Sequence, residues 1–277
     1  MITWLLLALS LLLLGFHRKL ALTTLAITTI SAFITGVITW YVLPVILSLI
    51  LLSYAYRHYK TNRLIATIVI LAFIAIIIGL TFHFIPGFNN LRYIKHVPLG
   101  QYSPPFSFYF NADKAVIPFI LMIFIPTLFK TEPVKKANKY QWVLLAMAIP
   151  ALLLFAMALG GLAIELHLPQ WLPAFMLANI FFVSLAEEAL FRGAIQQSLS
   201  RYLSRYLSPY LALFITAILF GLVHFAGGIL LIIFASLAGI IYGLAWMWSG
   251  RLWVATLFHF ALNLTHLLFF TYPFKIA

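Results

Sequence analysis

The sequence predicts an all-α fold, a polytopic transmembrane helical bundle with about 8–10 membrane spans. Of the 277 residues, 65% are hydrophobic and only 8% are charged, whereas a soluble domain carries about 25% charged residues to solvate its surface. Apolar runs recur along the whole chain, many close to the roughly 20 residues that a helix needs to cross the hydrocarbon core. Lipid is therefore the expected solvent for most of the surface.

The apolar runs can be followed in order along the chain. They cover residues 2–16, 20–36, 38–56, 64–84, 115–129, 141–161, 172–192, 209–226, 229–248 and 252–270. Several are shorter than a full crossing, so the expected number of spans is a range. The first run has no basic residue before it, and His17, Arg18 and Lys19 come after it. We therefore expect a retained first span rather than a cleaved signal peptide.

Basic residues outnumber acidic ones by 17 to 5, which gives a formal charge of +12. In a soluble protein this balance would suggest a nucleic-acid partner, but here the cations lie in short clusters between apolar runs. Such clusters set membrane topology and favour anionic lipid headgroups. If all runs span and the N-terminus is outside, 12 Lys and Arg are cytoplasmic and 4 are not. We expect a lipid bilayer and no nucleic acid as partners, and the lack of cysteine excludes thiolate catalysis.

The chain is expected to have two parts. Residues 1–165 are predicted to form N-terminal transmembrane helices with a long outer loop at 85–114, and residues 166–277 a motif-rich helical core. The loop is rich in proline, glycine and aromatic residues. Irregular backbone exposed to lipid would leave its amides unsatisfied, so the loop must lie at the outer interface or pack into protein. An aromatic connector is favoured over a lid.

Two adjacent carboxylates, Glu187 and Glu188, lie inside an apolar run. A charge there costs about 2.5–3.5 kcal/mol on insertion scales, and adjacent carboxylates resist simultaneous ionisation. Arg192 lies four residues after Glu188 on the same helical face, so these two can pair, while Glu187 points about 100° away. We predict a structural Glu188–Arg192 pair and a reactive Glu187, which could act as a general base on water. The alternative is that both glutamates anchor helix packing.

Two later runs carry the other polar candidates. His224 lies in the run 209–226, where a lone histidine is more often a packing residue than a ligand. His259 and Asn263 lie four residues apart on one face of the last run, and His266 could extend this polar edge. A histidine and an asparagine can donate hydrogen bonds to an oxyanion or ligate a metal. An interhelical hydrogen-bond pair is the alternative.

Three motifs follow one another: Glu187-Glu188-x-x-x-Arg192, Phe220-x-x-x-His224 and His259-x-x-x-Asn263. In this order they resemble the signature of the CPBP intramembrane proteases, also called ABI. That family includes the type II CAAX prenyl endopeptidases and proteins linked to bacteriocin processing or immunity. The resemblance covers about residues 172–272, so 166–277 would be a CPBP-like catalytic helical core. For the residues of the three motifs to lie at the same depth in the membrane, the helix that carries the glutamates must continue to about residue 200.

The resemblance implies hydrolysis of a peptide bond in or near the membrane. The catalytic residues that it implies are Glu187, Glu188, Arg192, His224, His259 and Asn263. By analogy, Glu187 and His224 would position and activate a water, and His259 and Asn263 would stabilise the oxyanion of the tetrahedral intermediate. The remaining two residues would brace the site.

The resemblance leaves the cofactor open, since the family has been described both as metalloproteases and as metal-free, glutamate-dependent enzymes. We expect no cofactor, with zinc as the alternative. Glu187, His224, His259 and Asn263 could form a metal site, although the His-Glu-x-x-His pattern of zincin proteases is absent.

The expected substrate is a peptide or a membrane protein. CAAX processing requires a prenylated cysteine near a protein C-terminus, and such substrates are not expected if the protein is prokaryotic. Peptide pheromones, bacteriocin leaders or membrane-protein tails are then better candidates, and the expected location is the bacterial plasma membrane.

Two other function classes remain as alternatives. A non-catalytic membrane scaffold or immunity protein could retain the motifs. A transporter would be expected to distribute polar residues over both halves of the chain, whereas here they concentrate in the last third.

Overall fold

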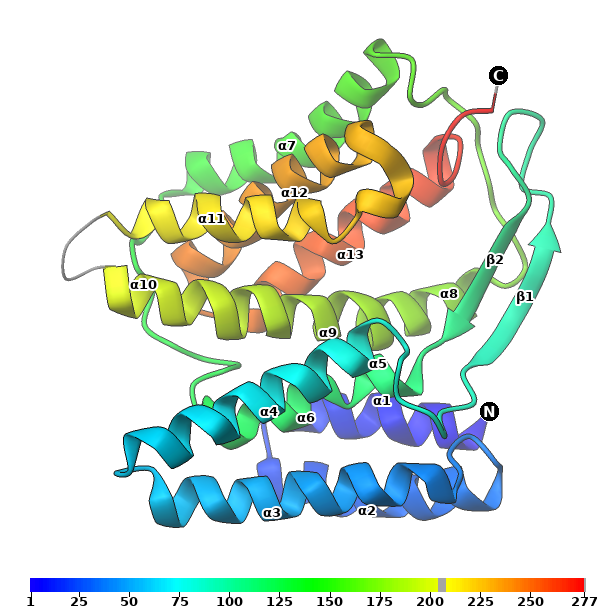
Figure 1. Ribbon diagram of the computed structural model, residues 1–277. Coiled ribbons are helices and arrows are strands. Elements are labelled where there is room, and N and C mark those ends of the chain that lie inside the picture. The colour runs from blue at the N-terminus through cyan, green and yellow to red at the C-terminus, as the bar shows by residue number, and fades with distance from the viewer. Residues whose placement is uncertain (204–207, 277) are drawn as a thin grey trace. The chain divides into compact units, whose positions relative to one another are not determined.

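The structure, a computed structural model, describes residues 1–203 and 208–276 (Figure 1). The described residues are mostly helical, and their one sheet has two strands. Within the described residues, six helices are long and apolar enough to cross a membrane. These findings confirm the all-α, polytopic helical bundle. The chain divides into two compact units, one formed by Met1–Leu91 with Phe110–Phe124 and the other by Arg92–Tyr109 with Ile125–Ala277. Nothing in this division tests the predicted boundary at residue 165.

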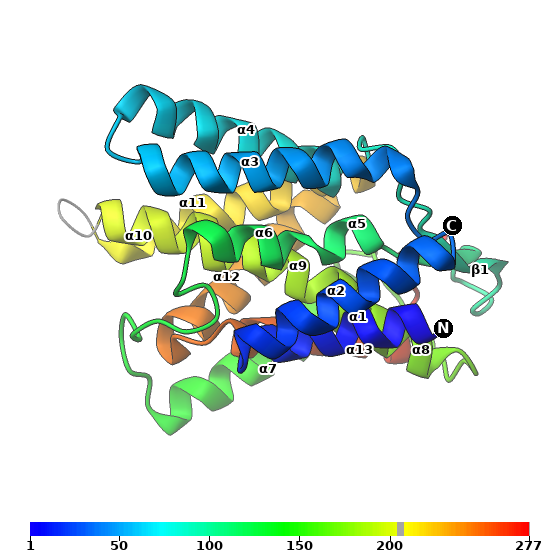
Figure 2. The same ribbon diagram turned by 90° about the horizontal axis from the view of Figure 1, so that it is seen from below.

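The first unit contains two pairs of helices. Its helices are α1 (Ile2–Leu14), α2 (Arg18–Ile34), α3 (Leu43–Tyr59, after a short 3-10 turn), α4 (Arg63–Thr81), α5 (Ala112–Ala115) and α6 (Ile117–Phe124). α1 packs along α2, and α3 packs along α4 (Figure 2). Thr3 Oγ1 lies 2.8 Å from Ser31 Oγ and so joins the first pair. Asn62 begins α4 by accepting hydrogen bonds from two backbone amides of its first turn.

Residues 115–129 do not form the spanning helix that their apolar run predicts. α6 has 8 residues and rises only about 12 Å, against roughly 30 Å of hydrocarbon. Pro126 explains its end at Phe124, because a proline disfavours helical backbone at the preceding residue. Two further apolar helices, α1 and α11 (Pro209–Leu222), are short. The described part of the chain thus has six helices of spanning length, and it reaches the lower end of the predicted range only if both short helices also cross.

The second unit holds the long helices of the C-terminal half. These are α7 (Lys139–Ala158), a continuous run from Leu172 to Leu203, α11, α12 (Gly228–Ser249) and α13 (Leu252–Phe269). The run consists of α8 (Leu172–Ala178), a π-helical segment (Asn179–Ser184), α9 (Leu185–Glu188), a second π-helical segment (Ala189–Gln196) and α10 (Gln197–Leu203). The run therefore continues past residue 200, as the motifs require. α11 packs on the second π-helical segment and on α12, and α12 packs on α13 (Figure 1).

The segment expected as a loop at 85–114 contains two strands that the sequence analysis did not predict. β1 (Leu91–Val97) and β2 (Phe106–Phe110) pair with each other. The sequence contained a signal for β2, because phenylalanine alternates with serine and tyrosine over residues 106–110, as in a strand. The rings of Phe106 and Phe108 lie 5.8 and 5.3 Å from the Trp171 ring. Aromatic side chains therefore pack this hairpin against the start of α8, which is one of the two placements expected for the segment.

Small residues bring α11 and α12 into close contact. A side-chain carbon added at Gly221 would lie 2.5 Å from the Ile232 carbonyl oxygen, and one at Gly239 would lie 3.1 Å from Ala217 Cα. Such close approach of backbones is typical of helix pairs in membranes. Replacing Gly221 by valine is expected to lower the free energy of unfolding by about 1–3 kcal/mol, because the two helices must separate. Thermal unfolding in detergent measures this change. Ile218→Val, on the exposed side of α11, is the control, and an equal loss in both variants would contradict the close-packing explanation.

Candidate active site

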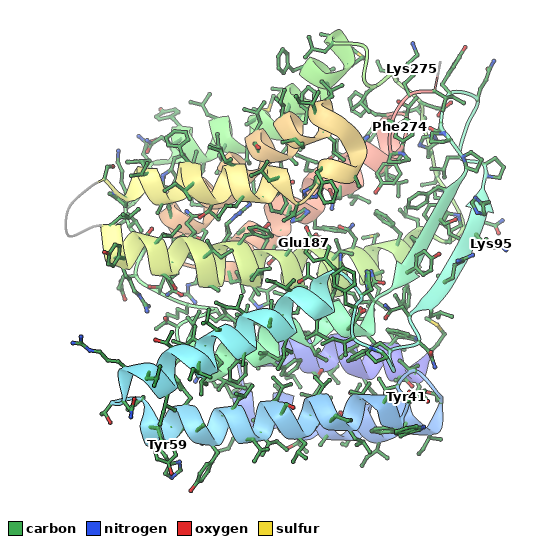
Figure 3. The ribbon with its side chains drawn as sticks, viewed as in Figure 1. Tyr41, Tyr59, Lys95, Glu187, Phe274 and Lys275 are labelled. Carbon is green, nitrogen blue, oxygen red and sulfur yellow. The ribbon has the colours of Figure 1, made fainter. Side chains whose placement is uncertain are left out.

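Three elements of the second unit carry the residues that the motifs identify. The run α8–α10 contributes both glutamates and the arginine, and Glu187 is labelled in Figure 3. His224 lies just beyond the end of α11 at Leu222, at the start of a 3-10 turn, rather than inside a span. α13 carries His259 and Asn263. All of these residues belong to one compact unit.

Glu188 lies at the centre of a buried group of ionisable side chains, with Arg192 and His259 as its partners. Its Oε2 lies 3.0 Å from Arg192 Nε, and its Oε1 lies 2.9 Å from His259 Nδ1. The side chains of Glu188 and Arg192 are both 0% exposed. The first contact is the ion pair that the spacing of four residues predicts. The contact with His259 was not predicted, because spacing within one helix does not show which other helix faces it.

Aromatic rings surround the Arg192 guanidinium. Its Cζ lies 4.9 Å from the Phe220 ring centroid and 5.7 Å from that of Tyr242, within the roughly 6 Å reach of a cation–π interaction. The contact with Glu188 is not aligned as a hydrogen bond, and Nη1 and Nη2 have no hydrogen-bond partner among the described residues. Attraction to the Glu188 carboxylate and to the ring faces therefore holds this buried cation.

Hydrogen bonds leave the same ring nitrogen available on two histidines. His259 Nδ1 contacts Glu188 Oε1, and His224 Nδ1 lies 2.7 Å from the Phe220 carbonyl oxygen. Both acceptors favour a proton on Nδ1, so Nε2 remains available for chemistry. Tyr242 stacks on His259, with ring centroids 4.6 Å apart and planes 10° from parallel. This stacking sets the plane of the His259 imidazole.

Asn263 is held by a residue that the sequence analysis missed. Its Nδ2 donates to Asn179 Oδ1 at 3.3 Å, and Ser184 Oγ donates to the same oxygen at 3.1 Å. Asn179 and Ser184 are both buried. The sequence did contain a signal for this network, because Asn179 and Ser184 are polar residues inside the apolar run 172–192.

A largely apolar cavity of about 440 Å³ lies against the histidines and Asn263. Its polar lining consists mainly of His224, His259, Asn263 and His266. Its apolar walls come from α7, α11, α12 and the segment after α13, and include Leu153, Phe220, Leu230, Phe234 and Phe274. The cavity therefore brings three of the six predicted catalytic residues to one surface.

Glu187 stands apart from this group. It is partly exposed, it is not among the described residues that line the cavity, and no hydrogen bond or ion pair joins it to another described residue. Its neighbour Glu188 is fully buried and doubly paired. The predicted pair of Glu188 and Arg192 is observed, whereas Glu187 does not share the cavity lining with His224, as the predicted water site would require. The predicted catalytic roles stay predictions.

The candidate metal ligands do not form a metal-binding group. Within residues 1–203 and 208–276, no three His, Asp or Glu side chains are grouped so that they could hold a metal ion. The predicted set of Glu187, His224, His259 and Asn263 is not among such groups, and zinc dependence stays an untested alternative.

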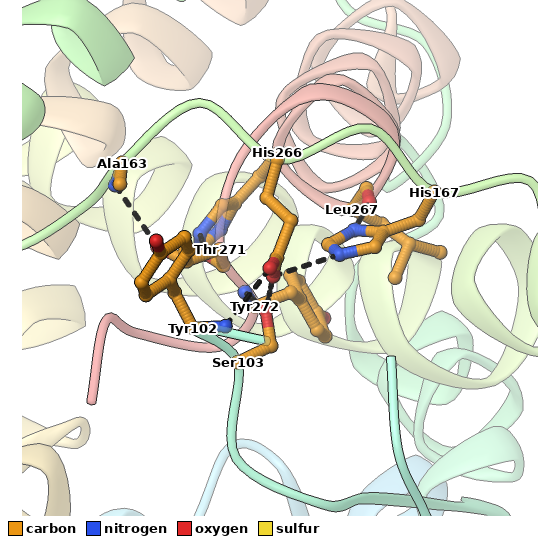
Figure 4. A network of polar contacts seen from close by, with 9 residues as sticks. Tyr102, Ser103, Ala163, His167, His266, Leu267, Thr271 and Tyr272 are labelled. Atoms are coloured by element: carbon orange, nitrogen blue, oxygen red, sulfur yellow. Dashed lines mark hydrogen bonds and ion pairs between the residues drawn. The ribbon is translucent and has the colours of Figure 1, made fainter. Parts of the chain in front are cut away.

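A second polar cluster, centred on Glu165, fixes the segment after α13 (Figure 4). Ser103 Oγ and His167 Nε2 lie 2.5 and 3.1 Å from Glu165 Oε2, and the Tyr272 amide donates to Ser103 Oγ at 2.9 Å. Tyr272 also lines the cavity. Burial raises the pKa of the Glu165 carboxyl, but hydrogen bonds from Ser103, the Tyr102 amide and His167 outweigh it and hold that pKa below its usual value.

The stability that this cluster provides is expected to depend on pH. Because the pKa of Glu165 is lower in the folded state, its contribution is fully present above the ordinary carboxyl pKa of about 4.3. It is lost as the pH falls through the folded value. His167 is the titratable neighbour of Glu165 and lies 3.1 Å from its Oε2. Glu165→Gln should therefore lower the unfolding temperature at pH 7, and this difference should shrink below about pH 4.

Thermal unfolding of both proteins across this pH range measures the difference. Glu132→Gln, at an exposed position, is the control for the chemical change. A difference between wild type and Glu165→Gln that stays constant with pH would contradict the assignment.

The helices, the composition and the comparisons with known proteins define a multi-pass integral membrane protein. Residues 169–265 match the model of the family described as type II CAAX prenyl endopeptidase Rce1-like. The matched segment contains all three motifs, so the resemblance to the CPBP proteases is confirmed there. The match indicates a CAAX-type intramembrane protease, a class of hydrolase that acts on peptide bonds. Neither the comparison with curated proteins nor that with solved structures gave a match.

Proposed function

We propose that this protein is an intramembrane endopeptidase that cleaves a peptide bond in or beside the membrane by means of a glutamate-activated water. One observation carries the proposal: His224, His259 and Asn263 line a common apolar cavity, inside the segment that matches an endopeptidase family. An apolar cavity with a few convergent polar groups is typical of a substrate site.

In the proposed reaction, Glu187 and the free Nε2 of His224 position a water and accept its proton as it attacks the peptide carbonyl carbon. The attack gives a tetrahedral oxyanion. Asn263 Nδ2 and a protonated Nε2 of His259 donate hydrogen bonds to that oxygen. Glu188 holds this imidazole in place through its contact with Nδ1. The proton held by the base then passes to the leaving amine as the C–N bond breaks.

Several features of Glu187 and its neighbours support this division of roles. Glu187 has no partner among the described residues, so its carboxylate is free to accept a proton. Arg192 and His259 both contact Glu188, which makes Glu188 the residue that braces the site. The proposed mechanism contains no metal step. Zinc dependence, the alternative, would appear as loss of cleavage on treatment with a chelator.

The cavity supports a class of substrate, and the apolar helices support the location. Apolar walls favour apolar residues beside the cleaved bond, as in peptide pheromones, bacteriocin leaders or membrane-protein tails. The apolar helices support a membrane location, and we propose the bacterial plasma membrane, with the N-terminus outside.

The proposal can be tested with the purified protein in detergent and two quenched fluorescent peptides. Both peptides carry an apolar segment, and one of them also carries a farnesylated cysteine near its C-terminus. Wild type should cleave at least one of them, and His224→Ala should lower kcat/KM by about 10²–10⁴-fold, because proton transfer is lost. His17→Ala, an exposed histidine, should cleave normally.

Equal rates for His224→Ala and wild type would remove His224 from the mechanism. If wild type cleaved neither peptide, the non-catalytic scaffold or immunity protein would become the better explanation.

A further inference from the structure

Asn179 is a buried amide at the centre of a small hydrogen-bond network that the three motifs do not include. It is 5% exposed, and its Oδ1 accepts hydrogen bonds from Ser184 Oγ at 3.1 Å and from Asn263 Nδ2 at 3.3 Å. An uncompensated amide in an apolar environment is costly. Its position in a run of apolar residues therefore calls for an explanation beyond packing.

The π-helical geometry of this segment makes the contact between Ser184 and Asn179 possible. Five residues of a regular α-helix turn through about 500°, so the two side chains would point about 140° apart. Asn179–Ser184 is instead π-helical, and in such a turn residues five apart come together. Single π-helical turns inside α-helices occur frequently at functional sites.

The network fixes which way the Asn263 amide faces. An asparagine amide has two N–H donors on Nδ2 and one acceptor oxygen. Asn179 Oδ1 accepts a hydrogen bond from one of these N–H groups. The Asn263 amide therefore turns its nitrogen, and not its oxygen, towards the run α8–α10. Asn263 also lines the cavity. The second N–H of the same nitrogen is therefore available to a group bound there.

We propose that Asn179 and Ser184 are positioning residues for the reaction: together they hold the Asn263 amide with its free N–H directed at the developing oxyanion. Ser184 donates to Asn179 Oδ1, and this orients the Asn179 amide so that its oxygen faces α13. Asn179 then orients Asn263. The inference rests on the proposed function, because it assigns Asn263 the oxyanion role and adds the residues that maintain its orientation.

Two pairs of nearly isosteric variants test the proposal. Asn179→Leu removes the acceptor, whereas Asn179→Asp keeps an oxygen in its place. Ser184→Val removes the hydroxyl, whereas Ser184→Thr keeps the hydroxyl in a side chain of nearly the same volume as valine. With the apolar quenched peptide as probe, Asn179→Leu should lower kcat by about 10–100-fold with KM nearly unchanged, because misplaced catalytic groups lose transition-state stabilisation. Asn179→Asp should retain most of the rate that Asn179→Leu loses. Ser184→Thr should likewise retain most of the rate that Ser184→Val loses.

Asn263→Ala and the double variant Asn179→Leu/Asn263→Ala complete the experiment. Asn263→Ala should lower kcat by about 10²–10³-fold, the cost of one lost oxyanion donor. The double variant should be no slower than Asn263→Ala alone, because residues that act as one unit are non-additive. Additive losses would overturn the positioning role, as would full kcat in Asn179→Leu beside a slow Asn263→Ala.

A different outcome would count against the proposed function rather than this inference. If Asn263→Ala itself cleaved at the wild-type rate, the oxyanion assignment would fail. Unfolding temperatures are measured for every variant. If Asn179→Leu does not fold, the comparison of Ser184→Val with Ser184→Thr decides the question, and equal rates in those two variants would overturn the proposal.

Discussion

Replacing Glu188 by glutamine is expected to lower the free energy of unfolding by about 3–5 kcal/mol. Glutamine has nearly the same shape, and its oxygen can still accept the hydrogen bond from His259. The charge is lost, however, and Arg192, which is 0% exposed, keeps its own. The guanidinium has no hydrogen-bond partner among the described residues and would retain only the ring faces of Phe220 and Tyr242. An unpaired buried charge is among the most costly defects in a protein.

Thermal unfolding in detergent measures this loss, and the chain offers a matched control. Glu187→Gln makes the same chemical change one residue earlier, at a partly exposed position with no described partner, and should shift the unfolding temperature little. Adding Arg192→Met to Glu188→Gln removes the orphaned cation and should restore much of the stability. If Glu187→Gln and Glu188→Gln unfolded at the same temperature, the contacts of Glu188 with Arg192 and His259 would not stabilise the fold as we infer.

Glu187→Gln is expected to reduce peptide cleavage by about 10²–10⁴-fold while the protein stays folded. A glutamine cannot accept the proton of the attacking water, so the base is lost. The Glu187 side chain makes no hydrogen bond or ion pair with another described residue, so the fold loses none. Stability and activity should therefore separate at these two neighbouring glutamates, with Glu188 affecting mainly folding and Glu187 mainly the reaction rate.

The cleavage rate of the quenched peptide measures this effect. Glu132→Gln, an exposed carboxylate, is the matched control and should cleave at the wild-type rate. Full activity in a folded Glu187→Gln would contradict the general-base role. Metal analysis of the same preparation would separate a glutamate-activated water from a zinc-bound one.

Composition and spacing were sufficient to predict the bundle and the pairing of Glu188 with Arg192, because both depend on local properties of the chain. Lipid solvation follows from apolar content, and a pair four residues apart follows from the helix repeat. The contact of His259 with Glu188 could not be predicted, since it joins α13 to α9 and depends on how the helices rotate against one another. Asn179 was missed because nothing near it in sequence indicates its partner on α13.

Other errors had local causes. The hairpin was overlooked because its prolines and glycines suggested irregular backbone, although β2 alternates as a strand does. The apolar run at 115–129 was taken as a span because hydropathy alone does not record that Pro126 ends the helix.

The two π-helical segments lie on either side of α9, and they have a consequence for the register of the whole run. Each π-helical turn accommodates one more residue than an α-helical turn, so each segment behaves as a one-residue insertion in a regular helix. Deleting Val183 would remove the first insertion and rotate α9 by about 100° relative to α8. The span would keep nearly the same length and hydropathy, yet Glu188 would turn away from His259. The number of residues between Asn179 and Glu188 therefore specifies the site, independently of the hydrophobicity that specifies the span.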